Sequence, residues 1–219
     1  MKIGIIDYGS GNLHSVHHSV AHAASKKTDM QVETLSETHS LQVCDYIIVP
    51  GVGHFADCWA GLLAIDGMVE ALGEAVLEKG KPFLGICVGM QLLANEGHEG
   101  GNITPGLGWI SGKVRHFADC LDGGDMGGLK IPHMGWNDLQ IKTSGHPVAA
   151  ALPAAVQMYF VHSYVFDEID TEHILAVTDY GLPVPALIGR DNIVGTQFHP
   201  EKSQHAGQAM LDAFLSWRP

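Results

Sequence analysis

Cys87 stands between glycines in the segment Gly85-Ile86-Cys87-Val88-Gly89, which follows a short apolar run and precedes a helix-like stretch. The flanking glycines permit a sharp turn from strand to helix, the setting of a G-x-nucleophile-x-G elbow with cysteine in place of serine. A sulfur at the start of a helix is favoured as a thiolate by the positive end of the helix dipole. This segment alone leaves open the alternative of a structural cysteine between two packing glycines.

His199 and Glu201 follow the last apolar run of the chain and are separated by Pro200. Side chains two residues apart on an extended chain lie on the same side, so the carboxylate can orient the imidazole as the base of a nucleophilic triad. Pro200 cannot donate to a sheet ladder, so strand pairing should stop here. A surface histidine–glutamate pair is the alternative. If both motifs end core strands, Cys87 and His199 share the rim where α/β sites form.

A third motif, Pro50-Gly51-Val52-Gly53, also follows an apolar run. Acyl transfer requires backbone N–H groups aimed at the developing oxyanion. Since glycine allows unusual peptide orientations, this loop can supply one such donor, and the N–H of Val88 can supply another. One rotation of the Val52–Gly53 peptide could switch the first donor on or off. Alone, the motif is equally consistent with a tight turn.

Strands and helices alternate in the first half of the chain. Near-continuous apolar runs, which are typical of parallel strands buried on both faces, are Lys2–Asp7, Tyr46–Pro50 and Pro82–Cys87. The expected helices between them are Leu13–Ala24 and Phe55–Lys79. This alternation indicates a doubly wound α/β fold.

The second half is richer in strands. The expected strands are Trp109–Phe117, Val156–Phe166, His173–Asp179, Val184–Gly189 and Ile193–Phe198, and an amphipathic helix, Ser203–Trp217, follows them. We therefore predict an open, mostly parallel central sheet with helices on both faces and a strand-rich second half. A length of 219 residues suits one domain, residues 1–219.

The composition is that of a folded, acidic protein. Hydrophobic residues make up 46% and charged residues 16%, and Lys and Arg number 12 against 24 Asp and Glu, for a formal net charge of -12. An acidic surface repels phosphate backbones and anionic lipids, so we expect neither nucleic acid nor membrane as a partner. No apolar run reaches the ~20 residues that a membrane-spanning helix needs.

The cysteines and histidines give no metal-binding pattern. Cys44, Cys58, Cys87 and Cys120 lack CxxC or similar spacing, and the first apolar stretch is too short for a signal peptide. We therefore expect reduced thiols and a cytoplasmic protein. Four histidines recur at helical spacing, but no cysteine or acidic ligand joins them, which favours a solvated helix face over a zinc site. They are His14, His17, His18 and His22. We expect neither metal nor cofactor.

Taken together, GICVGMQLL (85–93), HPEKS (199–203) and PGVGHF (50–55) resemble the class I, triad-type glutamine amidotransferases. Within that family, four further segments resemble the glutaminase subunit of imidazole glycerol phosphate synthase. These are DYGSGNLHSV (7–16), GLGWISGKV (106–114), KIPHMGWN (130–137) and FVHSY (160–164). The matching segments run from the first expected strand to the last helix.

The resemblance implies roles for individual residues. Cys87 matches the nucleophile, His199 the general base and acid, and Glu201 the carboxylate that orients the histidine. The remaining positions match the oxyanion strand (Val52 and Gly53), the glutamine pocket (Gln91, Ser163 and Tyr164) and surfaces that face a partner (Asn12, His133, Met134 and Trp136). Trp136, expected in a loop, suits a partner anchor.

The resemblance also implies an activity and a partner. Members of this family hydrolyse glutamine and pass ammonia to a (β/α)₈ cyclase subunit, which makes imidazole glycerol phosphate and an aminoimidazole carboxamide ribotide in histidine biosynthesis. This chain departs from the family pattern in its long Gly-rich segment Asp119–Leu129, which we expect to be a mobile surface loop near the partner.

Three other functions compete with this one. Another amidotransferase, serving purine, pyridoxal or anthranilate synthesis, would share the triad but lack PHMGWN and VHSY. A cysteine peptidase on a related α/β fold would lack a glutamine pocket. A non-catalytic regulatory subunit would be expected to have lost part of the triad, whereas all three residues are present here.

Overall fold

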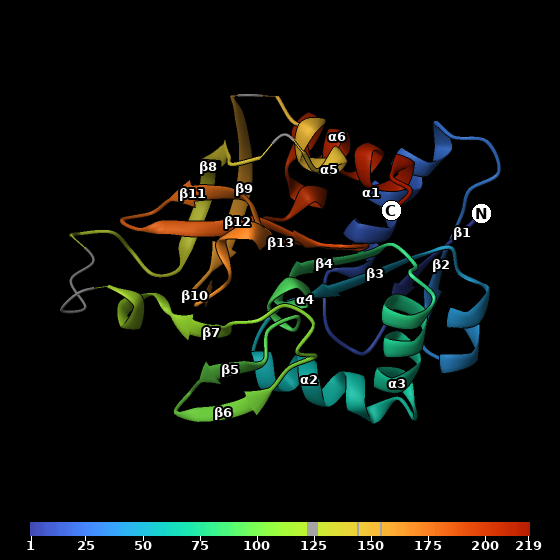
Figure 1. The fold of residues 1–219 in the computed structure, drawn as a ribbon, viewed down its shortest axis with the longest axis horizontal. Helices are drawn as coiled ribbons and strands as arrows, with labels where there is room; N and C mark the ends of the chain where they lie inside the picture. Colours follow the sequence, from blue (N-terminus) through green and yellow to red (C-terminus); the bar gives the residue numbers. More distant parts are fainter. Residues whose placement is uncertain (122–126, 144, 154) are drawn as a thin grey trace.

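A nine-stranded sheet forms the centre of the computed structural model, which describes residues 1–121, 127–143, 145–153 and 155–219 (Figure 1). In spatial order its strands are β2 (Gln31–Leu35), β1 (Lys2–Ile6), β3 (Tyr46–Gly51), β4 (Phe83–Cys87), β13 (Ile193–Thr196), β12 (Pro183–Arg190), β11 (Ile174–Asp179), β8 (His133–Ile141) and β9 (Val156–His162). Pairings from β2 to β13 are parallel, and those from β13 to β9 are antiparallel. Strands β12 and β8 therefore run against all the others.

Helices cover both faces of this sheet (Figure 1). On one face lie α1 (Leu13–Ser25), α5 (Pro147–Ala150) and α6 (Gln204–Ser216), and on the other lie α2 (Phe55–Ala64), α3 (Met68–Gly73) and the short α4 (Val88–Gln91). A smaller sheet packs beside α2 and contains β10 (Tyr164–Asp167), β7 (Lys113–His116), β5 (Glu96–Glu99) and β6 (Asn102–Pro105). The expected α/β fold with a strand-rich second half is confirmed.

Several expected boundaries are wrong. The single helix predicted over Phe55–Lys79 breaks after α2, where Ile65 is extended with a ψ of 113° and Gly67 adopts a left-handed φ of 68° before α3. A π-helical turn, Glu74–Glu78, follows α3. The strand predicted over Val156–Phe166 divides at Ser163 into β9 and β10, which belong to different sheets. Trp136 lies in strand β8 and not in a loop.

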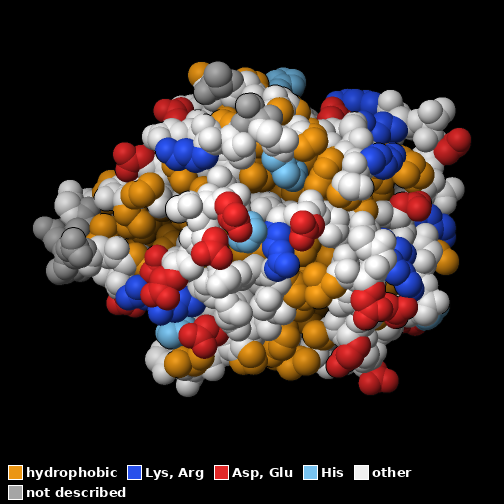
Figure 2. Space-filling view, viewed as in Figure 1, with side chains coloured by type: hydrophobic (Ala, Val, Ile, Leu, Met, Phe, Trp, Pro, Cys, Tyr) orange, Lys and Arg blue, Asp and Glu red, His pale blue; other side chains and the backbone are white. Residues whose placement is uncertain are grey.

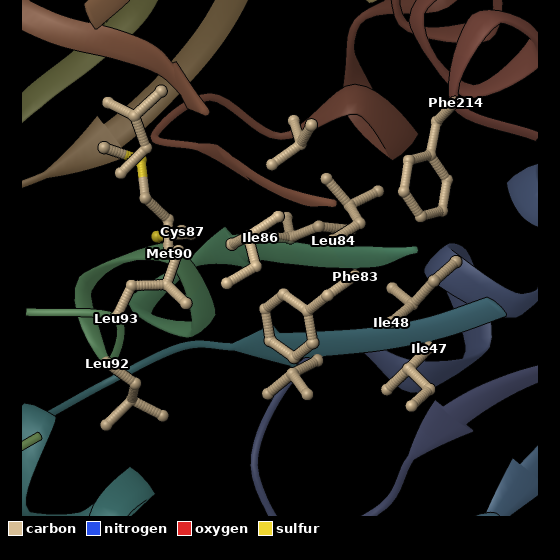
Figure 3. Packing of buried hydrophobic residues seen from close by; sticks show 14 of the residues in the cluster. Ile47, Ile48, Phe83, Leu84, Ile86, Cys87, Met90, Leu92, Leu93 and Phe214 are labelled. Carbon is tan, nitrogen blue, oxygen red and sulfur yellow. The ribbon is translucent and has the colours of Figure 1, made fainter. Parts of the chain in front are cut away.

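The core is centred on the parallel strands. All residues of β3 and β4 are buried, as expected for strands covered by helices on both faces. Figure 3 shows side chains of the two strands, including Ile47, Ile48 and Phe83, in one cluster with Phe214 of α6. Cys87 lies at the end of this packed region, so the rigid core fixes the position of its backbone.

The strand directions bring the candidate residues together. Strands β3, β4, β13 and β9 run the same way, so the segments that follow them lie at one rim of the sheet. Strand β8 runs the other way, and its first residue, His133, pairs in register with His162 at the end of β9. The first and second halves of the chain therefore meet at this rim.

The surface is acidic without one dominant patch on the face that Figure 2 shows, where acidic side chains of the described residues lie at separate points. Within the described ranges, no helix has the length and apolar character to span a bilayer. Of the Gly-rich segment Asp119–Leu129, residues 122–126 lie outside the described residues, and its expected mobility stays a prediction.

Candidate active site

Cys87 occupies a strained elbow between β4 and α4. Its φ of 55° and ψ of -111° place a non-glycine residue in a sparsely populated region. A Cβ at Gly85 would overlap the carbonyl of Gly89, and a Cβ at Gly89 would overlap the carbonyl of Val49. Both flanking glycines are therefore required by close packing of the strand on the helix. The thiol itself is buried, with an exposed fraction of 4%.

His199 lies just beyond β13 and is held by its backbone and its side chain. Its N–H donates to the carbonyl of Tyr159 at 2.9 Å, and its carbonyl accepts from Ser203 Oγ at 2.7 Å. Its Nδ1 lies 2.8 Å from Glu201 Oε1, and both side chains are 2% exposed. Its Nε2 is buried without a hydrogen-bond partner among the described residues, so this nitrogen is available to a reacting group.

The imidazole of His199 is electrostatically unlike that of an ordinary buried histidine. Burial lowers its pKa, but the neighbouring Cys87 sulfur and the Glu201 carboxylate outweigh burial and raise the pKa to about 10. His199 therefore carries a proton at neutral pH. An imidazolium next to a cysteine sulfur favours the thiolate, the reactive form.

The other three thiols are less suited to react. All four cysteines are free, but burial raises the pKa of Cys44 and of Cys58, and raises that of Cys120 to about 11. None of these three lines the pocket that contains Cys87. The geometry therefore distinguishes one thiol from the rest.

The loop after β3 lies at the entrance to the site. The carbonyl of Val52 accepts from Ser10 Oγ at 2.7 Å and from Cys58 Sγ at 3.4 Å, and its N–H donates to Ser10 Oγ at 3.3 Å. Gly53 has a φ of 89°, which disfavours other residues. Val88 is the first residue of α4, so its N–H has no partner within the helix. Both expected oxyanion donors thus belong to the pocket wall.

A pocket of about 360 Å³ opens above Cys87 and His199, within the range of roughly 300–1,000 Å³ typical of small-molecule sites. Its lining includes each residue expected to bind substrate, namely Gln91, Ser163 and Tyr164. A larger groove of about 740 Å³ lies at the opposite rim, beside the turn Arg190–Asn192, but it contains none of the residues selected for chemistry. The smaller pocket is therefore the candidate active site.

The sequence patterns missed three polar residues of this site. His162 and Lys202 line the pocket, and Gln197 lies behind it with its side-chain Nε2 3.7 Å from Cys87 Sγ. His162 stands within FVHSY, Lys202 stands within HPEKS, and Gln197 lies two residues before His199, so proximity to the motif residues was the available signal. Spacing alone does not say which neighbours of a catalytic residue turn inward.

The residues expected on a partner surface divide into two groups. Met134 is 65% and Trp136 is 45% exposed, as large apolar anchors should be. His133 is 3% exposed, so its expected position on the surface is wrong. Alternation along β8 turns His133 inward and Met134 outward. Asn12 caps helix α1 through Ser15 N and also lines the pocket.

No group of three or more potential ligands could hold a metal ion in the part of the chain that the structure describes. The histidines of α1 include His14, His18 and His22 on its exposed side. This placement fits a solvated helix face.

Comparison with known proteins agrees with this geometry. Residues 4–216 match the family described as Glutamine amidotransferase class-I. The chain is 47% identical over 223 residues to the imidazole glycerol phosphate synthase subunit HisH of Brucella suis and 48% identical over 220 residues to that of Rhodospirillum rubrum, with 100% of each chain covered. A solved structure of PurLQS from Thermotoga maritima shares the fold, with a TM-score of 0.70 at 17% identity over 98% of this chain and 97% of that chain.

Proposed function

Because the chain belongs to the class I glutamine amidotransferase family, among relatives named imidazole glycerol phosphate synthase subunit HisH, we propose that it hydrolyses glutamine to glutamate and ammonia. The observation that carries this proposal is the buried His199, held at 2.8 Å from Glu201 and lining the same pocket of about 360 Å³ as Cys87. We further propose that the ammonia passes to a (β/α)₈ cyclase partner of histidine biosynthesis in the cytoplasm.

In the first half of the reaction, the Cys87 thiolate attacks the side-chain amide carbon of glutamine and forms a tetrahedral intermediate. The N–H groups of Gly53 and Val88 are the proposed donors to its oxyanion. His199 then gives its proton to the leaving nitrogen, the C–N bond breaks, and ammonia leaves. A γ-glutamyl thioester remains on Cys87.

In the second half, water attacks the thioester while His199, now neutral, takes a proton from it. The C–S bond breaks, glutamate is released, and the thiolate and the imidazolium are restored. Glu201 takes no separate chemical step in this scheme. It orients the imidazole through Nδ1, at 2.8 Å, and stabilises its charge.

The proposed partner surface is the exposed part of β8. Met134 and Trp136 lie side by side on the outward face of this strand, and the pocket residue Asn12 belongs to the same rim of the sheet. Large exposed apolar side chains of this kind are typical anchors of protein interfaces. A heterodimer formed here would place the cyclase next to the site that releases ammonia.

The test is glutamate release by the purified chain alone, with the cyclase subunit, and with the cyclase subunit plus its ribonucleotide ligand. We expect turnover in the complex and none in Cys87→Ala, and a diazo-ketone analogue of glutamine should label Cys87 alone. Free ammonium should still support synthesis by the complex that carries Cys87→Ala. Labelling at Cys44, Cys58 or Cys120 would contradict the assignment of the nucleophile.

A further inference from the structure

Gln197 has no part in the steps above, although its side-chain amide is buried among the reacting groups. The residue is 0% exposed. Its Nε2 donates to Cys87 Sγ at 3.7 Å, and its Oε1 accepts from Gln91 Nε2 at 3.0 Å. A buried primary amide costs free energy unless its polar atoms find partners. Both polar atoms of Gln197 are engaged within the site, which points to a function there.

The orientation of this amide follows from the chemistry of its neighbours. Gln91 Nε2 lies 3.2 Å from the backbone carbonyl of Tyr164, which can only accept a hydrogen bond. Gln91 must therefore direct its amino group, and not its oxygen, toward the carbonyl of Tyr164. The same amino group meets Gln197, so Gln197 must present its oxygen there. Its own amino group is thereby directed to the sulfur of Cys87.

A neutral N–H donor aimed at sulfur favours the thiolate over the thiol, because only the anion is a strong acceptor. His199 gives up its proton during the reaction, whereas an amide keeps both of its protons throughout. We propose that Gln197 is a positioning residue that stabilises the Cys87 thiolate and fixes the sulfur for attack. This inference rests on the proposed role of Cys87 as the nucleophile.

The decisive measurement is the rate of alkylation of Cys87 by iodoacetamide as a function of pH, followed by mass spectrometry of the Cys87 peptide in the full chain. Gln197→Met keeps the approximate shape and removes the donor. We expect the midpoint of its pH–rate profile to rise by about one pH unit, the value of one modest hydrogen bond to a charged group. Gln197→Glu places a carboxylate against the sulfur, so its midpoint should rise further.

Glutamine turnover by the complex provides a second readout. At pH values below the alkylation midpoint, Gln197→Met should lower kcat by up to about tenfold, and this loss should shrink as the pH rises and the thiolate forms without help. Gln91→Met should shift the alkylation midpoint in the same direction by less, since it frees the Gln197 amide without removing it. The matched control is Gln208→Met, which replaces a glutamine that donates to the carbonyl of Ser19 at 3.3 Å and does not line the pocket. It should leave the midpoint unchanged.

The outcomes separate this inference from the proposed function. An unchanged midpoint in folded Gln197→Met and Gln197→Glu would overturn the role of Gln197, while Cys87-dependent turnover would still support the function. A shifted midpoint without glutaminase activity would support the role of Gln197 and contradict the proposed function. The unmodified chain provides a test without any variant. The side-chain amide resonances of Gln197 should titrate with the midpoint of Cys87 alkylation, and a pH-independent signal would count against the contact.

Discussion

Two pairs of buried side chains at the same rim of the sheet contain histidine, and their charges differ. His199 contacts Glu201 at 2.8 Å, and the Cys87 sulfur and this carboxylate outweigh burial and raise its pKa to about 10. His133 and His162 contact each other at 3.0 Å, and burial lowers their pKa values to about 4 and about 3. Burial is common to both pairs, so the anionic partner decides whether the imidazole carries a proton.

The neutral pair has a defined hydrogen-bond direction. The carbonyl of Tyr164 accepts from His162 Nδ1 at 2.8 Å, so His162 Nε2 must accept from His133 Nδ1. His133 Nε2 then accepts from Asn137 Nδ2 at 3.2 Å. The comparison teaches that burial alone keeps an imidazole neutral, while a neighbouring carboxylate and thiol keep it protonated.

Removal of the charged imidazole should have the largest effect. His199→Ala deletes the group that we propose activates Cys87 and protonates the leaving ammonia, so glutamine turnover by the complex should fall by about a thousandfold or more. His133→Asn, in the neutral pair, should lose far less activity in the folded protein. Glutamate release at saturating glutamine measures both. Equal losses in the two variants would mean that the distinction between the pairs does not decide catalysis.

The next change converts the charged pair into a neutral one. Glu201→Gln keeps an acceptor for Nδ1 but removes the charge, so we expect a loss of about thirtyfold, smaller than in His199→Ala. Because the pKa of His199 is raised in the folded state, its protonation stabilises the protein fully below pH ~6.5. This stabilisation is lost as the pH rises through about 10. Urea unfolding at pH 7 and pH 9.5 should therefore show a smaller alkaline loss in Glu201→Gln. Total inactivation, as in His199→Ala, would assign Glu201 a larger role.

The same contrast shows what could be predicted from the sequence. Cys87, His199 and Glu201 were found because short motifs place them where strands end, and strand ends in a parallel sheet converge. The pocket residues Gln91, Ser163 and Tyr164 came from resemblance, and the structure brings them to the same cavity.

The features that the sequence did not predict depend on long-range packing. His133 was expected on the surface, but the register of β8 against β9 turns it toward His162. Gln197 was missed because its importance comes from Gln91, 106 residues away in the sequence. The break within the expected helix depends on an extended Ile65 and a left-handed Gly67, which apolar periodicity does not reveal. Such features follow from tertiary contacts and not from local patterns.

The neutral pair, His133 and His162, should make the folded protein less stable at acid pH. Histidines with lowered pKa values bind protons more weakly in the folded state than in the unfolded chain, so stability is lost as the pH falls below ~6.5. Each should contribute about 1.4 kcal/mol per pH unit between roughly pH 6 and 4.5. His133→Asn should therefore reduce that slope by about this amount in urea unfolding. The exposed His18→Gln is the control and should not alter the slope.

The smallest expected effect concerns the Val52–Gly53 peptide, the proposed oxyanion donor that His199 and Cys87 need for catalysis. In the isolated chain, Ser10 Oγ donates to the carbonyl of Val52 at 2.7 Å and accepts from the N–H of Val52 at 3.3 Å. We take this orientation to be the resting one, so Ser10→Ala should make rotation of the peptide easier and raise glutamine hydrolysis by the chain alone. One hydrogen bond of about 1 kcal/mol corresponds to roughly a fivefold increase.

This prediction separates the loop from the two histidine pairs, since Ser10 contacts neither of them. The rate of the complex with its ribonucleotide should change little in Ser10→Ala, because the partner already favours the active orientation, so the ratio of activated to basal rate should narrow. Ser25→Ala removes a comparable hydroxyl-to-carbonyl hydrogen bond, to His22 at 2.8 Å, far from the loop and serves as the control. A basal rate that falls in Ser10→Ala would mean that Ser10 instead holds the peptide in the orientation that catalysis uses.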